Sequence, residues 1–120
     1  AAEGFDAGEQ RRDFVAVEDV VRVILFFFEH PEISGIFNCG TGRARSFNDL
    51  ARHLIALRGG GTVTYVPFPP ELTGKYQSHT QADLGALRRV GCDLSFPPLE
   101  ESLAAYVRRL QRQEGFLSAP

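Results

Sequence analysis

The chain has few of the features that mark membrane, secreted or disulfide-bonded proteins. No apolar run approaches the ~20 residues that a membrane span needs, and no basic start, apolar centre and small-residue cleavage site marks secretion. The only cysteines are Cys39 and Cys92, and they need not pair. We therefore expect a protein of the cytoplasm with no membrane partner.

Neither sign of charge predominates, and methionine is absent. Thirteen basic and fifteen acidic side chains give a formal net charge of -2, without the positive excess expected of a nucleic-acid-binding protein. Because residue 1 is alanine, we expect the natural translation start to lie outside this chain, which is either processed or a piece. The 120 residues, 43% hydrophobic and 23% charged, suffice for one packed domain.

Sequence motifs of common catalytic and metal sites are also missing. The chain contains no G-x-S-x-G, H-E-x-x-H or G-x-x-x-x-G-K-[ST] motif. The histidines His30, His53 and His79 have no spacing that would place two of them on one turn beside a carboxylate, so no metal site is predicted.

Periodicity and turn residues predict an α/β chain with alternating strands and helices. A strand, a helix and a second strand between residues 35 and 68 would form a parallel pair with a right-handed crossover. Residues 1–12 are an irregular lead-in, 13–112 the folded domain and 113–120 a frayed tail. Strands are expected at 13–17, 35–39 and 62–68, and helices at 18–30, 47–57, 84–90 and 97–110.

The predicted helix at 18–30 is apolar on almost every side. Between Val20 and Phe28 its only polar residue is Arg22, so it needs cover from several directions. A lone domain of this size supplies such cover poorly. Cys39, inside a short apolar run, is expected to be a small core residue.

One glycine-containing turn, Gly40-Thr41-Gly42, lies between a predicted strand and a predicted helix. It lacks the third glycine of a dinucleotide-binding fingerprint, because position 45 is Arg. The turn either feeds a helix capped by Ser46 or forms a loop at which Arg43 and Arg45 contact an anion.

Two further groups could contact an anion. The Arg11-Arg12-Asp13 cluster offers guanidinium forks that match a phosphate or a carboxylate, although simple solvation at the surface fits the sequence equally well. Lys75-Tyr76 lies in a polar loop after a predicted strand, the edge at which open α/β sheets hold ligands. Tyr76 could also be a partly buried anchor of that loop.

Several motifs resemble a known superfamily. R-D-F-V-A-V-E-D-V from Arg12 and I-F-N-C-G-T-G from Ile36 are similar to the C-terminal part of extended short-chain dehydrogenase/reductases. Y-V-P-F-P from Tyr65, G-K-Y-Q from Gly74 and T-Q-A-D-L from Thr80 resemble one member group, the ADP-L-glycero-D-manno-heptose 6-epimerases. The resemblance spans roughly residues 4–110.

The resemblance implies an NADP-dependent epimerase that interconverts the D-glycero and L-glycero forms of ADP-manno-heptose for the inner core of lipopolysaccharide. Hydride would be removed from the carbon bearing the side-chain hydroxyl and returned to the opposite face. A homo-oligomer is implied too. The alternatives are another nucleotide-sugar epimerase, dehydratase or reductase of the superfamily, or a non-catalytic nucleotide-sugar-binding or assembly module.

The resemblance also assigns substrate-contacting positions. It implies that Arg12 binds the ADP-sugar, by our interpretation through its diphosphate, that Tyr76 contacts it from the loop, and that Glu3, Gly4 and Phe5 form another contacting segment. The family's nucleotide-binding Rossmann half, with its Tyr-x-x-x-Lys pair, has no counterpart here, since the only lysine is Lys75. We therefore expect a small substrate-binding portion that is inactive alone, with NADP and the catalytic residues in the missing half, whose sheet would cover helix 18–30.

Overall fold

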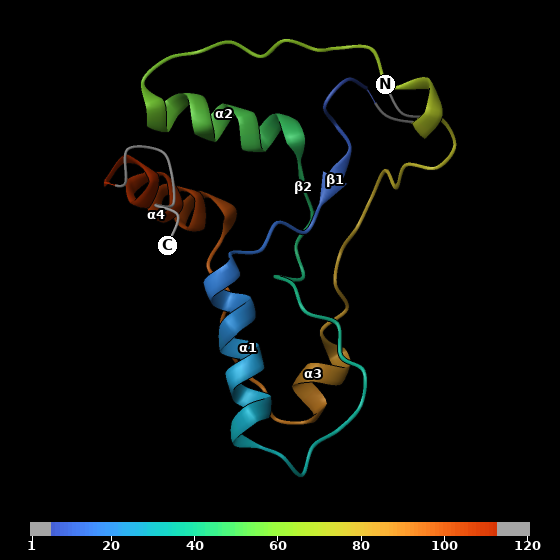
Figure 1. Ribbon diagram of the computed structural model, residues 1–120, viewed down its shortest axis with the longest axis vertical. Helices are drawn as coiled ribbons and strands as arrows, with labels where there is room; N and C mark the ends of the chain where they lie inside the picture. Colours follow the sequence, from blue (N-terminus) through green and yellow to red (C-terminus); the bar gives the residue numbers. More distant parts are fainter. Residues whose placement is uncertain (1–5, 113–120) are drawn as a thin grey trace, which may run out of the picture.

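A computed structural model describes residues 6–112 of the chain (Figure 1). Glu3, Gly4, Phe5 and the predicted tail at 113–120 lie outside the described residues. The elements are β1 Arg11–Arg12, α1 Val17–Glu29, β2 Arg45–Ser46, α2 Phe47–Arg58, the 3-10 helix η1 Pro70–Leu72, α3 Gly85–Arg89 and α4 Leu99–Arg112.

The predicted helices are present, and local capping explains their limits. Helix α2 begins where the Ser46 hydroxyl accepts a hydrogen bond from the backbone N–H of Asp49, at 3.0 Å. It ends at Gly59, whose φ of 83° is a left-handed conformation that glycine adopts readily. Helix α3 is shorter than predicted, and none of the helices in residues 6–112 has the length and apolarity needed to cross a membrane.

Strand pairing differs from the sequence-based prediction. Within residues 6–112 the one sheet has two strands, β1 and β2, and they are antiparallel, with Arg11 opposite Ser46 and Arg12 opposite Arg45. The predicted strand segments 13–17, 35–39 and 62–68 join no sheet, so the predicted parallel pair is not confirmed. Composition can favour extended backbone in these segments, but a strand also needs a neighbour to receive its hydrogen bonds.

The buried core lies between α1 and α3. Val23 of α1 packs there with Leu87, Cys92 and Phe96, and apolar side chains surround this cluster. The prediction that Cys39 is a core residue was wrong, because its thiol is exposed. Phe37 of the same segment packs against the core cluster, whereas Cys39 is not among the residues that do.

The molecule is open in shape. Its radius of gyration is 17.1 Å, whereas a compact chain of this length has a radius of about 14 Å. Helices α2 and α4 pack side by side, α1 and α3 lie beyond the small sheet, and the segment from α2 to η1 runs as an extended strap over α2 (Figure 1).

The outer face of α1 is apolar and uncovered. Large side chains at helical spacing along it are exposed, among them Phe28 at 81%. Ile36, in the segment that follows the helix, is 97% exposed. This pattern confirms that α1 is apolar on more sides than the described chain can cover. The exposed side chains on α1 are Val17, Val21, Ile24, Leu25 and Phe28.

Candidate functional site

Arg12 and Tyr76, predicted from sequence as substrate contacts, lie next to each other. The guanidinium carbon of Arg12 is 4.8 Å from the centroid of the Tyr76 ring and 6.0 Å from that of the Phe47 ring. Tyr76 in turn packs edge-on against Phe68, with centroids 5.1 Å apart. These distances place the guanidinium against aromatic rings, where its charge is attracted to the ring electrons.

Backbone carbonyl groups hold the Arg12 side chain in place. Its Nη1 donates to the carbonyl oxygen of Arg11 at 2.8 Å, and its Nη2 donates to that of Gln77. In residues 6–112 no carboxylate forms an ion pair with this guanidinium. Because a partly buried, uncompensated guanidinium favours an anion, Arg12 is suited to bind a phosphate or a carboxylate.

The loop that carries Tyr76 is attached to β1. The Arg11 N–H donates to the carbonyl of Ser78 at 2.9 Å, and the Thr80 N–H donates back to the carbonyl of Arg11 at 3.1 Å. Arg11 and His79 consequently form a parallel bridge. This pairing is the reason that residues 64 positions apart in the chain, Arg12 and Tyr76, meet.

A groove adjoins the pair of residues. It is a cavity of about 540 Å³ between α2 and the strap at 62–68, a volume within the range of small-molecule sites. The Tyr65 hydroxyl donates to Oδ1 of Asn48 at 2.6 Å and ties the strap to α2. Tyr76 and Phe47, the two rings against Arg12, both line the groove. Its other lining residues include Gly8, Leu50, Leu54, Val63, Val66 and Phe68.

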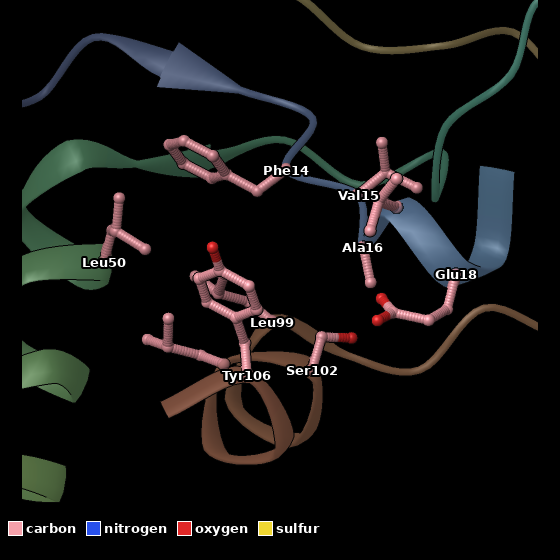
Figure 2. Close-up of a pocket in the computed structure, with 10 residues that line it drawn as sticks. Phe14, Val15, Ala16, Glu18, Leu50, Leu99, Ser102 and Tyr106 are labelled. Carbon is pink, nitrogen blue, oxygen red and sulfur yellow. The ribbon is translucent and has the colours of Figure 1, made fainter. Parts of the chain in front are cut away.

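A second cavity, of about 280 Å³, lies between the start of α1, α2 and α4 (Figure 2). Leu50, Leu99 and Phe14 line it, and Tyr106 points from α4 toward Phe14. Its one charged lining residue, Glu18, accepts a hydrogen bond from Arg109 at 2.8 Å. No positively charged side chain lines this cavity, so it is less suited to an anionic ligand than the groove beside Arg12.

The glycine turn at 40–42 binds a carboxylate of this chain, that of Asp13. Asp13 accepts four hydrogen bonds: Oδ1 from the N–H and hydroxyl of Thr41 at 2.9 and 2.5 Å, and Oδ2 from the N–H groups of Gly42 and Ala82 at 2.8 and 3.1 Å. The geometry therefore favours the tight-turn interpretation. Asp13 belonged to a predicted anion-contacting cluster, but sequence reasoning missed its role as the acceptor for this turn.

The two arginines that follow the turn also bind groups of this chain. The Arg43 guanidinium donates to the carbonyl of Phe96 at 3.0 Å. The Arg45 guanidinium donates to Glu100 at 2.5 Å and to Asp49 at 3.4 Å. Hydrogen bonding from Arg45 lowers the pKa of Glu100 to about 2, with a smaller contribution from His53, 3.2 Å away. The Arg45 contacts join α4 to α2, whereas the Arg12 guanidinium lies against Phe47 and Tyr76, two residues that line the groove.

One known family matches the N-terminal part of the chain. The NAD dependent epimerase/dehydratase family matches residues 3–40, a range that includes Arg12, Asp13 and Gly40.

Two known proteins are similar over most of this chain. ADP-L-glycero-D-manno-heptose-6-epimerase of Alkalilimnicola ehrlichii is 54% identical over 106 residues, covering 88% of this chain and 33% of that protein. The protein of the same name from Thiobacillus denitrificans is 50% identical over 123 residues, covering 90% of this chain and 37% of that protein.

A solved structure agrees with the sequence comparison. The crystal structure of Helicobacter pylori ADP-L-glycero-D-manno-heptose-6-epimerase aligns with a TM-score of 0.71 and 30% identity, covering 87% of this chain and 31% of that one. The predicted resemblance is thus confirmed: the chain is similar to proteins named ADP-L-glycero-D-manno-heptose-6-epimerase. It spans about a third of the length of these relatives.

Proposed function

We propose that residues 13–112 form the C-terminal substrate-binding domain of an epimerase that interconverts ADP-D-glycero-D-manno-heptose and ADP-L-glycero-D-manno-heptose. The conversion would proceed by transient oxidation and re-reduction and would serve synthesis of the lipopolysaccharide inner core in the cytoplasm. The relatives named as 6-epimerases, with 54% and 50% identity, support this assignment.

One structural observation carries the proposal: Arg12 has an uncompensated guanidinium next to Tyr76 at the edge of a groove large enough for a small ligand. The diphosphate of an ADP-sugar would bind Arg12, because a guanidinium fork donates two parallel hydrogen bonds to such an anion. Tyr76 would contact the same ligand through its hydroxyl. Glu3, Gly4 and Phe5 would complete the contact from the preceding segment.

The cofactor of such an enzyme, NADP, does not fit the glycine turn of this chain. The amides of Thr41 and Gly42, which could hold a dinucleotide phosphate, donate to Asp13 instead. A Cβ at Gly40 would come within 2.6 Å of the Asp13 carboxylate, so the turn has no room for a phosphate at that point. We assign NADP binding and the catalytic residues to the part of the relatives' length that this chain does not span.

The exposed apolar face of α1 would dock that nucleotide-binding part. The chain spans 33% and 37% of the two relatives, so most of such a protein is available to cover the face. Its exposed valine, isoleucine, leucine and phenylalanine side chains match the apolar face of a sheet better than they match water. The complete enzyme would be a homo-oligomer, and this chain alone would be inactive.

The direct test is to express the full reading frame and to measure NADP-dependent epimerisation of ADP-D-glycero-D-manno-heptose. Turnover of this substrate with transient reduction of bound NADP supports the proposal. Turnover of UDP- or dTDP-sugars in its place would assign the chain to another nucleotide-sugar enzyme. Binding of ADP-sugar without turnover by the full-length protein would indicate a non-catalytic module.

A further inference from the structure

We infer that Asp13 is a positioning residue: its carboxylate holds Arg12 and the Tyr76 loop in the arrangement that receives the ADP-sugar. This inference rests on the proposed function for the identity of the ligand. Asp13 does not contact Tyr76 or the groove, so its effect on the ligand would pass through the backbone that it ties together.

The carboxylate joins three segments that are distant in the sequence. It follows Arg12 directly on the first segment, accepts from Thr41 and Gly42 on the second, and accepts from Ala82 on the third. The third segment leaves the Tyr76 loop immediately after the Thr80 pairing with β1. Fixing Ala82 relative to Asp13 therefore anchors the chain on the C-terminal side of the loop's contact with Arg12.

All four groups that face the carboxylate are donors. Oδ1 receives two of them and Oδ2 the other two. In Asp13→Asn one of these oxygens becomes an NH2 group. At Oδ2 this group would face two backbone N–H donors, and at Oδ1 it would face the Thr41 N–H, with the Thr41 hydroxyl as its one acceptor. The isosteric change therefore breaks at least one of the four hydrogen bonds while it preserves the volume of the side chain.

Close packing at Gly40 supports the same conclusion. A Cβ at this position would lie 2.6 Å from Oδ2 of Asp13 and 2.8 Å from the Cβ of Ala82, closer than real contacts permit. Gly40 is buried at the junction. The three segments consequently meet without space for a side chain, and Gly40→Ala should displace the same contacts as Asp13→Asn.

The test uses the full-length protein and two measurements. Steady-state kinetics with ADP-D-glycero-D-manno-heptose should show, for Asp13→Asn, a KM raised about tenfold and a kcat within about threefold of wild type, since fewer molecules hold the binding-competent arrangement. Saturating substrate should restore the rate. Hydrogen exchange should show faster exchange at Gly42, Ala82 and Thr80, with α4 amides unchanged.

Asp83→Asn is the matched control. Its Oδ1 also accepts from a backbone amide, that of Gly85 at 2.8 Å, but it does not join the segments around Arg12. We expect a KM within about twofold of wild type for this variant. If Asp13→Asn fails to fold, Thr41→Val removes the hydroxyl donor to Oδ1, together with the hydrogen bonds between that hydroxyl and the Arg43 backbone, and should raise KM about threefold.

The outcomes separate this inference from the proposed function. An absence of ADP-sugar turnover by the wild type overturns the proposed function, and hydrogen exchange then decides the role of Asp13 by itself. Unchanged exchange at Ala82 and Thr80 in Asp13→Asn overturns the positioning role. So does faster exchange with an unchanged KM, a fall in kcat at constant KM, or an equal loss in Asp83→Asn.

Discussion

The region around Arg12 and the outer face of α1 differ in how many of their possible contacts are made within this chain. Around Arg12 the backbone of β1, the Tyr76 loop and the glycine turn are joined by hydrogen bonds within the chain. On α1, Phe28 and its apolar neighbours face solvent. The difference indicates that hydrogen bonds within the described residues organise the candidate site, whereas the apolar face of α1 has no cover among residues 6–112.

The largest expected effect concerns Arg12. In the full-length protein, Arg12→Ala should weaken ADP-sugar binding by about 2 to 5 kcal/mol, the usual cost of removing one partner of a desolvated charge pair. Isothermal titration calorimetry measures this loss of binding free energy. Arg11→Ala is the matched control, because the exposed Arg11 side chain donates only to the carbonyl of Ala44. Unchanged affinity in Arg12→Ala would remove this residue from the site.

The uncovered face of α1 should cause the isolated chain to self-associate or to exchange strands. Phe28→Glu should weaken that association by about 1.5 to 3 kcal/mol, since burial of one phenylalanine side chain contributes about that much. Analytical ultracentrifugation over a concentration series measures the change, with the exposed Glu29→Gln as control. A wild-type chain that stays monomeric and binds no hydrophobic dye would contradict the prediction that the uncovered face of α1 causes self-association.

Tyr76→Phe should have a smaller effect than either change. The variant keeps the ring contacts with Arg12 and Phe68 and removes only the hydroxyl. We expect about 1 kcal/mol weaker ADP-sugar binding if that hydroxyl makes one neutral hydrogen bond to the ligand. The same titration measures it, and Tyr106→Phe, on the second cavity, is the control. A loss as large as that of Arg12→Ala would show that the ring geometry itself had changed.

The smallest expected effect concerns the contact between α4 and α2. Its contribution to stability depends on pH. Arg45 lowers the pKa of Glu100 from 4.5 to about 2 in the folded chain. A carboxyl with a lowered folded-state pKa contributes stability above pH 4.5, and this contribution is lost as the pH falls toward 2. Because the Glu100 side chain is 41% exposed, solvent screens the pair, and we expect less than about 1 kcal/mol.

Urea unfolding at pH 6 and pH 3 tests this contribution. Glu100→Gln should reduce the difference between the two free energies of unfolding by about 0.5 to 1 kcal/mol. Glu101→Gln, an exposed neighbour with no ion pair among residues 6–112, should leave the difference unchanged. An identical pH difference in wild type and Glu100→Gln would show that the ion pair does not stabilise the fold.

Helices could be predicted from the sequence and strands could not, for a physical reason. The limits of α2 depend on neighbouring residues, the Ser46 cap and the left-handed Gly59, so local patterns suffice. The strap at 62–68 has strand-forming residues but no partner, and β1 and β2 are short segments that composition does not mark. Pairing depends on which distant segments meet, and periodicity carries no such information.

The residues of the candidate site also divide into those that could be predicted from the sequence and one that was missed. Arg12 and Tyr76 were predicted as contacts of one ligand, and the structure brings them together. Asp13 was missed because a carboxylate beside two arginines suggests an ion pair. The available signal was the turn at 40–42, whose free amides require an acceptor from elsewhere in the chain.

The hydrogen bonds that hold Arg12 have a consequence for the rate of ligand binding. Its long side chain is restrained before any ligand arrives, because it donates to Arg11 and Gln77 and packs against Tyr76. An incoming diphosphate would meet a guanidinium that need not search among rotamers, so little side-chain entropy would be lost on association. The encounter would then be limited by diffusion and by the approach of the ligand to the groove, rather than by rearrangement of the arginine.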